Sequence, residues 1–345
     1  MKNLFLLAFL AALIAFLITP FMKKIAIRFN VVDIPKDNRR VHKTIMPKLG
    51  GISIYVAFVA IVILKTGALT CYEIGIIIGA TVIVIGGVID DKFNIRPWQK
   101  LIFQIVAAII LIAFKVQIAV VTNPLSDSNL YININSIIGI PITILWIIGV
   151  TNAFNLIDGL DGLSAGIAFI ACVTMTIVGY ISGIAQPEIV AITAILAGAI
   201  LGFLPYNFNP ASIFMGDAGA QLLGFLLAAI SIKGATKSAS AFVLAVPILA
   251  LGLPIYDTIF AIIRRKVNGK SIVEADKGHF HHRLLDMGLS QKQAVIIMYF
   301  ISAVLGLMSV IVFQLTNKRA YFVLCIVLVA IVLLALKLGL FKHKS

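Results

Sequence analysis

The sequence predicts an all-α polytopic membrane protein with about eleven transmembrane helices. Of its 345 residues, 61% are hydrophobic and only 12% are charged, and the mean hydropathy is +1.09. Soluble domains contain about 25% charged and about 45–50% apolar residues. Apolar runs of about 20 residues, the length at which a helix crosses a bilayer, recur along the whole chain. Because backbone polar groups in lipid must bond internally, and the runs are too long for barrel strands, helices are required.

We expect a single membrane domain, 1–345. Its eleven expected spans are 3–22, 49–65, 74–90, 100–117, 136–153, 162–182, 187–204, 218–233, 240–260, 294–314 and 320–339. The first span resembles a signal peptide, but no small-residue cleavage site follows it and the basic KKIAIR comes next, so we interpret it as an anchor. The three cysteines stand far apart without a CxxC motif, which indicates packing residues and not a disulfide or zinc site.

The distribution of charge predicts the orientation in the membrane. With eleven spans, the side that carries the C-terminal tail also holds 21 of the 28 Lys and Arg residues. Positive charge favours the cytoplasmic side, so we expect the N-terminus outside and the C-terminus inside. This bias, together with attraction to anionic lipid headgroups, accounts for the net charge of +14. Nucleic-acid binding is not expected, since no basic domain stands apart from the membrane.

The acidic residues indicate where the chemistry takes place. Eleven of the 14 Asp and Glu residues lie on the same, positive side, mostly at the ends of spans. Asp90 and Asp91 end the third span in the motif GVIDD. The dipole at a helix C-terminus favours cations, so a carboxylate pair there is unfavourable and indicates function. We therefore expect an active site on the cytoplasmic loops.

Two further inner segments carry candidate ligands. In NAFNLIDGLDGLSAG, Asn155, Asp158 and Asp161 are three residues apart and share one side of a helical path. Asp161 has an alternative role as the N-cap of the sixth span. In PYNFNPASIFMGDAGA, Asp217 stands where the eighth span begins, as an N-cap or a metal ligand. We favour the metal ligand, because Asn207 and its neighbours make this an unusually polar entry.

The first inner loop is basic. Most of its charge is explained by membrane orientation, but Arg40, His42 and Lys48 are candidates for contact with a phosphate or lipid headgroup. The loop closes on Pro47-x-x-Gly-Gly, a tight backbone entry into the second span that we expect a phosphate to approach closely.

The last long inner loop contains HFHHR. Its candidates are His279, His281, His282 and Arg283. Zinc sites have other spacings and would not need the many acids, so we interpret this segment as an anion-binding arm. Asp257 lies two turns inside the ninth span, where it is either functional or a structural partner of the basic residues of the arm.

Together these residues predict phosphoryl transfer. Oxygen ligands without thiols suit Mg²⁺, with Mn²⁺ as the alternative, and Mg²⁺ takes one or two carboxylates plus substrate phosphates. Asp217, with Asp90, Asp91 or Asn155, is expected to hold the ion, and the basic residues to neutralise a diphosphate. At the membrane surface we expect the acceptor to be a lipid phosphate.

The same residues carry a family resemblance over essentially the whole chain. GVIDD, NAFNLIDGLDGLSAG, FMGDAG and HFHHRL occur in the order and spacing of the polyprenyl-phosphate N-acetylhexosamine-1-phosphate transferases, a glycosyltransferase 4 type family. The resemblance implies a Mg²⁺-dependent enzyme of the bacterial cytoplasmic membrane. It would transfer N-acetylhexosamine 1-phosphate from a UDP-sugar to undecaprenyl phosphate and release UMP, as the first membrane step of a cell-envelope glycopolymer.

The resemblance also implies roles for individual residues. Asp90 and Asp91 resemble the acidic pair near the lipid phosphate, Asp217 the metal ligand, and Asn155 and Asp158 residues of the same centre. The implied contacts to the nucleotide and diphosphate are Asp161, Asn207, His279, His281 and His282. HFHHR resembles the WecA/TagO-type branch that uses UDP-GlcNAc, since the branch that uses UDP-MurNAc-pentapeptide usually has three contiguous histidines followed by an acid.

Two mechanisms and one rival function remain open. An aspartate, Asp91 or Asp90, attacks first, or the lipid phosphate attacks directly. We favour direct attack, because a phosphate monoester with a second pKa near 6 is already mostly a dianion at pH 7. A secondary transporter would place its ionisable groups near the midplane in repeated halves, and the sequence shows no such repeat. Glycine-rich spans 3 and 6 would allow a homodimer.

Overall fold

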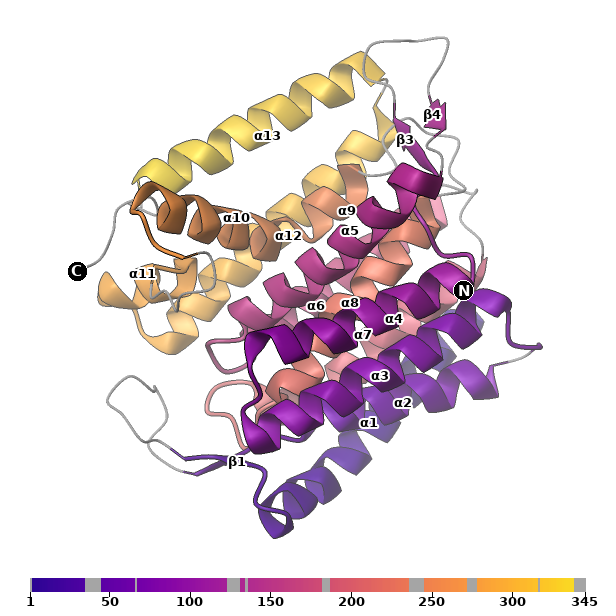
Figure 1. Ribbon diagram of the computed structural model, residues 1–345, viewed down its shortest axis with the longest axis vertical. Helices are drawn as coiled ribbons and strands as arrows, with labels where there is room; N and C mark the ends of the chain where they lie inside the picture. Colours follow the sequence, from indigo (N-terminus) through magenta and orange to yellow (C-terminus); the bar gives the residue numbers. More distant parts are fainter. Residues whose placement is uncertain are drawn as a thin grey trace.

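The protein is a bundle of long helices with very little β-structure (Figure 1). The computed structural model describes residues 2–34, 45–65, 67–122, 131–133, 136–181, 187–235, 245–271, 278–315 and 317–337. The helices in these ranges are α1 Lys2–Arg28, α2 Gly50–Leu64, α3 Cys71–Phe93, α4 Pro97–Ala113, α5 Ser136–Ile157, α6 Leu163–Ile181, α7 Pro187–Asn207, α8 Gly216–Ala235, α9 Ala245–Ala250, α10 Gly252–Val267, α11 Phe280–Asp286, α12 Gln291–Gln314 and α13 Asn317–Lys337.

Within the described residues, each of the eleven expected spans is largely helical, which confirms an all-α polytopic membrane protein. Seven helices of the described ranges are long and apolar enough to cross a bilayer, namely α1, α3, α5, α6, α7, α12 and α13. The apolar helices α2 and α4 are shorter. The number of crossings and the orientation remain predictions.

The expected span 240–260 is not one continuous helix. It is divided into α9 and α10, with a turn at Leu251. Pro254 accounts for the position of the interruption, because it has no N–H to donate to the carbonyl of Ala250 and is tolerated within the first turn of α10. α10 also continues to Val267, seven residues beyond the expected end, and carries Arg264 and Arg265 into the bundle.

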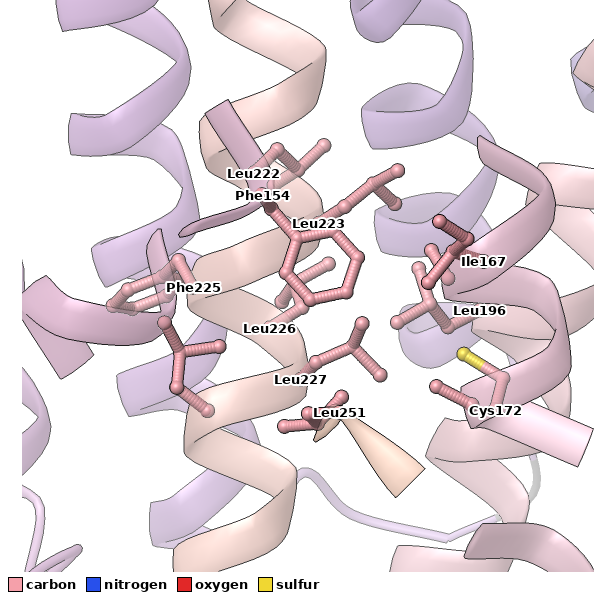
Figure 2. Close-up of a cluster of buried hydrophobic side chains, with 14 of the residues drawn as sticks. Phe154, Ile167, Cys172, Leu196, Leu222, Leu223, Phe225, Leu226, Leu227 and Leu251 are labelled. Carbon is pink, nitrogen blue, oxygen red and sulfur yellow. The ribbon is translucent and has the colours of Figure 1, made fainter. Parts of the chain in front are cut away.

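Helix α8 forms the centre of the bundle. Its side chains from Ala218 to Ile232 are buried on every side, as expected of a helix that is apolar all round. Its leucines lie among Phe154 of α5, Ile167 of α6 and Leu196 of α7 (Figure 2). Glycines permit the closest approaches: a Cβ on Gly224 would lie 2.6 Å from the Cα atom of Thr151 in α5.

The two ends of the bundle differ. Two short antiparallel hairpins mark them, β1 Val32–Asp33 with β2 Met46–Pro47, and β3 Val120–Thr122 with β4 Tyr131–Asn133. β1 and α11 lie at one end and β3 and β4 at the other (Figure 1). Because successive long helices run in opposite directions, the inner segments singled out by the sequence converge at the β1 and α11 end.

Candidate active site

An ionic cluster joins α3, α4, α5 and α8 at this end. The ammonium group of Lys100, on α4, pairs with the carboxylate of Asp90 and lies 2.6 Å from Oδ2 of Asp217. Nδ2 of Asn155 donates a hydrogen bond to Oδ1 of Asp217 at 3.1 Å. The other oxygen of Asp90 accepts from the backbone N–H of Ile95 at 3.0 Å. One lysine therefore neutralises two carboxylates that come from different helices.

Asp91 supplies the N-terminal cap of α8. Its Oδ1 accepts from the backbone N–H of Asp217 at 2.9 Å, and its Oδ2 accepts from that of Ala218 at 3.1 Å. A carboxylate is stabilised at a helix N-terminus, so the charge that is unfavourable for α3 is favourable for α8. Gly216, with φ of +72°, makes this possible, since a Cβ there would lie 2.4 Å from Oδ2 of Asp91. Asp217 itself is therefore not the cap.

Asp161 connects two loops and does not cap α6 in the described hydrogen bonds. Its Oδ2 accepts from Nδ2 of Asn209 and from the backbone N–H of Ala211, both at 3.0 Å. Burial, together with the negative charges of Asp217 and Asp161, raises the pKa of Asp158 to about 8. The loop between α5 and α6 therefore adds carboxylates to a region that is already rich in negative charge.

A cavity of about 260 Å³ opens between these segments. It is lined by Asp33, Lys48, Asp91, Asp158, Gly159, Leu160, Asp161, Asn207, Phe214, Met215, Gly216, Asp217, His282 and Gln291. Of the candidates, Lys48, Asp91, Asp158, Asp161, Asn207, Asp217 and His282 thus share one cavity. Asp90 and Asn155 adjoin it through their contacts with Lys100 and Asp217. Arg283 is not among the lining residues.

The histidine arm is anchored by the acid inside the ninth span. Oδ2 of Asp257 lies 2.8 Å from Nδ1 of His279, and its Oδ1 accepts from the backbone N–H of Phe280 at 2.8 Å. Of the two roles considered for Asp257, the structure shows the structural one. His279 is thereby buried in a hydrogen bond with Asp257, and its contact with a diphosphate remains a prediction.

His281 packs between the arm and the α5–α6 loop. Its ring stacks on that of His279, with centroids 5.9 Å apart, and lies against that of His282 at 4.2 Å. A Cβ on Gly159 would lie 2.4 Å from Nε2 of His281, so any side chain there would displace this ring. Burial, with the neighbouring His282, lowers the pKa of His281 to about 3. His282 is the histidine of this arm that lines the cavity.

The first inner loop differs from expectation at its glycines. The backbone N–H of Gly50 donates to the carbonyl of Phe214 at 3.0 Å, and that of Gly51 to Met215 at 2.9 Å. A Cβ on Gly51 would lie 2.2 Å from the Cα atom of Gly219. The protein backbone therefore fills the space that we expected for a phosphate, so that expectation was wrong. Arg40 and His42 lie outside the described residues.

Sequence reasoning missed Lys100. It begins the expected fourth span, where a lysine is readily explained by membrane orientation alone. Its position at the same end as GVIDD was the available signal. Gln291 lines the cavity and accepts a hydrogen bond from Nδ2 of Asn209 at 3.0 Å. No motif or spacing in a single sequence indicates this role.

Comparison with known proteins identifies close relatives. The profile of glycosyl transferase family 4 matches residues 73–235. A "Probable undecaprenyl-phosphate N-acetylglucosaminyl 1-phosphate transferase" of Bacillus subtilis (strain 168) is 37% identical over 339 residues, 98% of this chain and 93% of the relative. A "Decaprenyl-phosphate N-acetylglucosaminephosphotransferase" of Mycolicibacterium smegmatis is 34% identical over 87% of this chain and 79% of the relative. An "Undecaprenyl-phosphate alpha-N-acetylglucosaminyl 1-phosphate transferase" of Thermotoga maritima is 26% identical over 94% of both chains.

Proposed function

The chain belongs to glycosyl transferase family 4, and we propose that it transfers N-acetylglucosamine 1-phosphate from UDP-GlcNAc to undecaprenyl phosphate, releasing UMP. The similar proteins are named as transferases of this group to undecaprenyl or decaprenyl phosphate. The observation that carries the proposal is the single cavity at one end of the bundle, which joins Asp91, Asp158, Asp161 and Asp217 to Lys48. Carboxylates beside a basic group suit a site where a diphosphate is bound and cleaved.

The position of the cavity supports the proposed lipid acceptor and the proposed orientation in the membrane. It lies at the end of the bundle that holds most of the basic residues, which supports a location at the cytoplasmic face of a bacterial cytoplasmic membrane. A polyprenyl phosphate can place its headgroup there with its tail in the bilayer. Because the lining residues come from segments spread between Asp33 and Gln291, we propose that residues 1–345 act as a single catalytic domain.

The donor set fits a magnesium ion that is shared with substrate. Among the described residues, no three His, Cys, Asp or Glu side chains are arranged to hold a metal by themselves. Mg²⁺ typically takes one or two protein carboxylates plus substrate phosphates. The pKa of Asp158 is raised first by burial and then by the negative charges of Asp217 and Asp161, which a bound cation would offset. We propose that Asp217 and Asp158 hold the ion, which would neutralise the diphosphate, while Asn155 orients Asp217.

The geometry supports direct displacement by the lipid phosphate. Both oxygens of Asp91 accept backbone hydrogen bonds, and Asp90 is held by Lys100 and Ile95. A carboxylate engaged in this way is poorly free to attack phosphorus. We assign the Asp pair to organising the site, Asp91 through α8 and Asp90 through Lys100. The oxygen of the lipid phosphate then forms the new bond to the sugar-linked phosphorus as the bond to UMP breaks.

The histidine arm supports UDP-GlcNAc as the proposed sugar donor. His282 lines the cavity, and the ring of His281 packs against the ring of His282. Asp161 and Asn207 line the same cavity and are the proposed nucleotide contacts. The rival donor, UDP-MurNAc-pentapeptide, is disfavoured because the similar proteins are named for GlcNAc.

A reconstitution assay tests the proposal. Purified protein receives undecaprenyl phosphate, Mg²⁺ and either UDP-GlcNAc or UDP-MurNAc-pentapeptide, and UMP release and lipid-linked product are measured. We expect release with UDP-GlcNAc alone, abolished by EDTA and by Asp217→Ala. Glu188→Gln, which changes a carboxylate at the opposite end of the bundle, should retain activity. Release only with the peptide donor would overturn the donor assignment, and release with neither would overturn the function.

A further inference from the structure

A layer of three amide side chains, two buried and one half-buried, lies directly beneath the ionic cluster. Nε2 of Gln104 donates to Oε1 of Gln221 at 3.1 Å and to Oδ1 of Asn152 at 3.3 Å. Asn152 returns a hydrogen bond from Nδ2 to Oε1 of Gln104 at 2.9 Å, and it also donates to the carbonyl of Ile148. Gln104 and Gln221 are almost completely buried. The three amides come from α4, α5 and α8.

The amide layer repeats the helices of the ionic cluster one turn deeper. Three or four residues along a helix return a side chain to the same face. The pairs on each helix are Lys100 with Gln104, Asn155 with Asn152, and Asp217 with Gln221. The same helices that meet through Lys100, Asn155 and Asp217 thus meet again through neutral amides.

Helix α4 buries few of its own side chains completely. Its buried residues are Gln104, Ala107, Ala108 and Leu111, and two of these are alanines with little shape to set a register. A buried amide that lacks its partners costs free energy, so the hydrogen bonds of Gln104 disfavour any sliding or rotation of α4. Lys100, one turn away, is carried by the same backbone.

We propose that Gln104, with Asn152 and Gln221, acts as a positioning layer that keeps Lys100 between Asp90 and Asp217. This inference rests on the proposed function for its catalytic consequence, but the position of Lys100 can be measured without turnover. When the layer is broken, α4 shifts relative to α8, the ammonium group leaves its two carboxylates, and the cluster loses its neutralising charge. The remaining site residues keep their own supports, such as the cap that Asp91 provides.

Covalent labelling of Lys100 tests the position directly. The full-length protein in detergent is treated with an amine-acylating reagent at one fixed pH, and the rate at Lys100 is followed by peptide mass spectrometry, with exposed Lys92 as the internal reference. In the wild type, two carboxylates hold the Lys100 ammonium group, which should slow labelling. Gln104→Met, near in size but unable to form the three hydrogen bonds of the Gln104 amide, should label about fivefold or more faster at Lys100, since the net loss of even one hydrogen bond corresponds to about that factor.

Ser231→Ala is the matched control. It removes another hydrogen bond between α5 and α8, from Nε1 of Trp146 at 2.9 Å, outside the amide layer. We expect unchanged labelling of Lys100 in this variant. If Gln104→Met fails to fold, Gln221→Met, which removes a single hydrogen bond of the layer, carries the same comparison. Equal labelling of wild type and layer variant, or equal acceleration in Ser231→Ala, would overturn the proposal.

Turnover adds a second readout. In the assay described above, Gln104→Met should lower kcat by about tenfold or more, as a misplaced catalytic group does. The KM for UDP-GlcNAc should change little, because the cavity lining is intact. A changed KM with unchanged kcat would contradict positioning through Lys100. A wild type without turnover would contradict the proposed function alone, since the labelling comparison still decides the inference.

Discussion

The carboxylate of Asp91, at the end of α3, caps the helix that begins at Asp217. One oxygen accepts from the backbone N–H of Asp217 at 2.9 Å, and the other from the next residue at 3.1 Å. This contact joins residues 126 positions apart and fixes one wall of the cavity. The adjacent Asp90 points to Lys100, which also pairs with Asp217. Two neighbouring carboxylates thus hold the same helix end by different means.

Asp91→Asn should therefore weaken both fold and activity. The amide has one oxygen in place of two, so one N–H of α8 loses its acceptor, and the favourable charge at the helix N-terminus disappears. We expect the free energy of unfolding to fall by about 1–3 kcal/mol. Thermal melting in a fixed detergent, with UMP release in parallel, measures both effects. Asp33→Asn, which weakens a 4.0 Å contact with Lys48 and leaves the cap of α8 intact, should melt close to the wild type. An Asp91→Asn variant with the wild-type melting temperature would refute the capping role.

Lys100→Met should abolish most activity while the protein remains folded. The apolar side chain keeps the length of the stem but leaves Asp90 and Asp217 without the cation between them. We expect kcat to fall by about a hundredfold or more, the size of loss seen when a preorganised charge is removed. Lys92→Met, an exposed lysine at the same end of the bundle, is the control. Steady-state UMP release measures kcat for each variant. A Lys100→Met variant with kcat within about twofold of the wild type would exclude Lys100 from the site.

The fold class and most of the candidate site could be predicted because both depend on local sequence patterns. Apolar runs determine helices in lipid, and the alternation of helix direction brings every second loop to one end. Asp158, Asp161 and Asp217 therefore had to lie near one another once the runs were assigned. The break between α9 and α10 was also visible in principle at Pro254, but a proline can sit within a continuous span, as Pro20 does in α1.

The rest depended on contacts between distant segments. Asp91 looked unfavourable at the end of α3 because the sequence does not reveal which helix begins beside it. Gly51 suggested an open backbone, whereas Gly219, from a helix far along the chain, occupies that space. Lys100 resembled any lysine at the end of a span that is predicted to face the cytoplasm. Packing partners of this kind are set by tertiary structure and leave no periodic signal in a single sequence.

Two glycines allow opposite predictions for the same substitution. A Cβ on Gly51 meets the backbone of Gly219 at 2.2 Å, so Gly51→Ala must push α2 away from α8 and destabilise the fold. A Cβ on Gly159 meets the ring of His281 at 2.4 Å, which a side chain can relieve by moving. Gly159→Ala should therefore melt near the wild type but raise the KM for UDP-GlcNAc through the displaced arm. Melting curves and KM values for both variants test the contrast, which fails if Gly159→Ala is the less stable of the two.

His281 should make the fold sensitive to acid. Its pKa is lowered to about 3 in the folded protein, against about 6.5 in an unfolded chain. Between these values the unfolded state binds the additional proton, so stability falls as pH decreases below about 6.5, by at most about 1.4 kcal/mol per pH unit. Above pH 6.5 the side chain is neutral in both states and has no effect. His281→Gln removes this contribution, so the loss of melting temperature between pH 7.5 and pH 5.0 should be smaller than in the wild type. His282→Gln, at the half-buried neighbouring ring, is the control, and equal pH sensitivity in wild type and His281→Gln would show that His281 is not held neutral by burial.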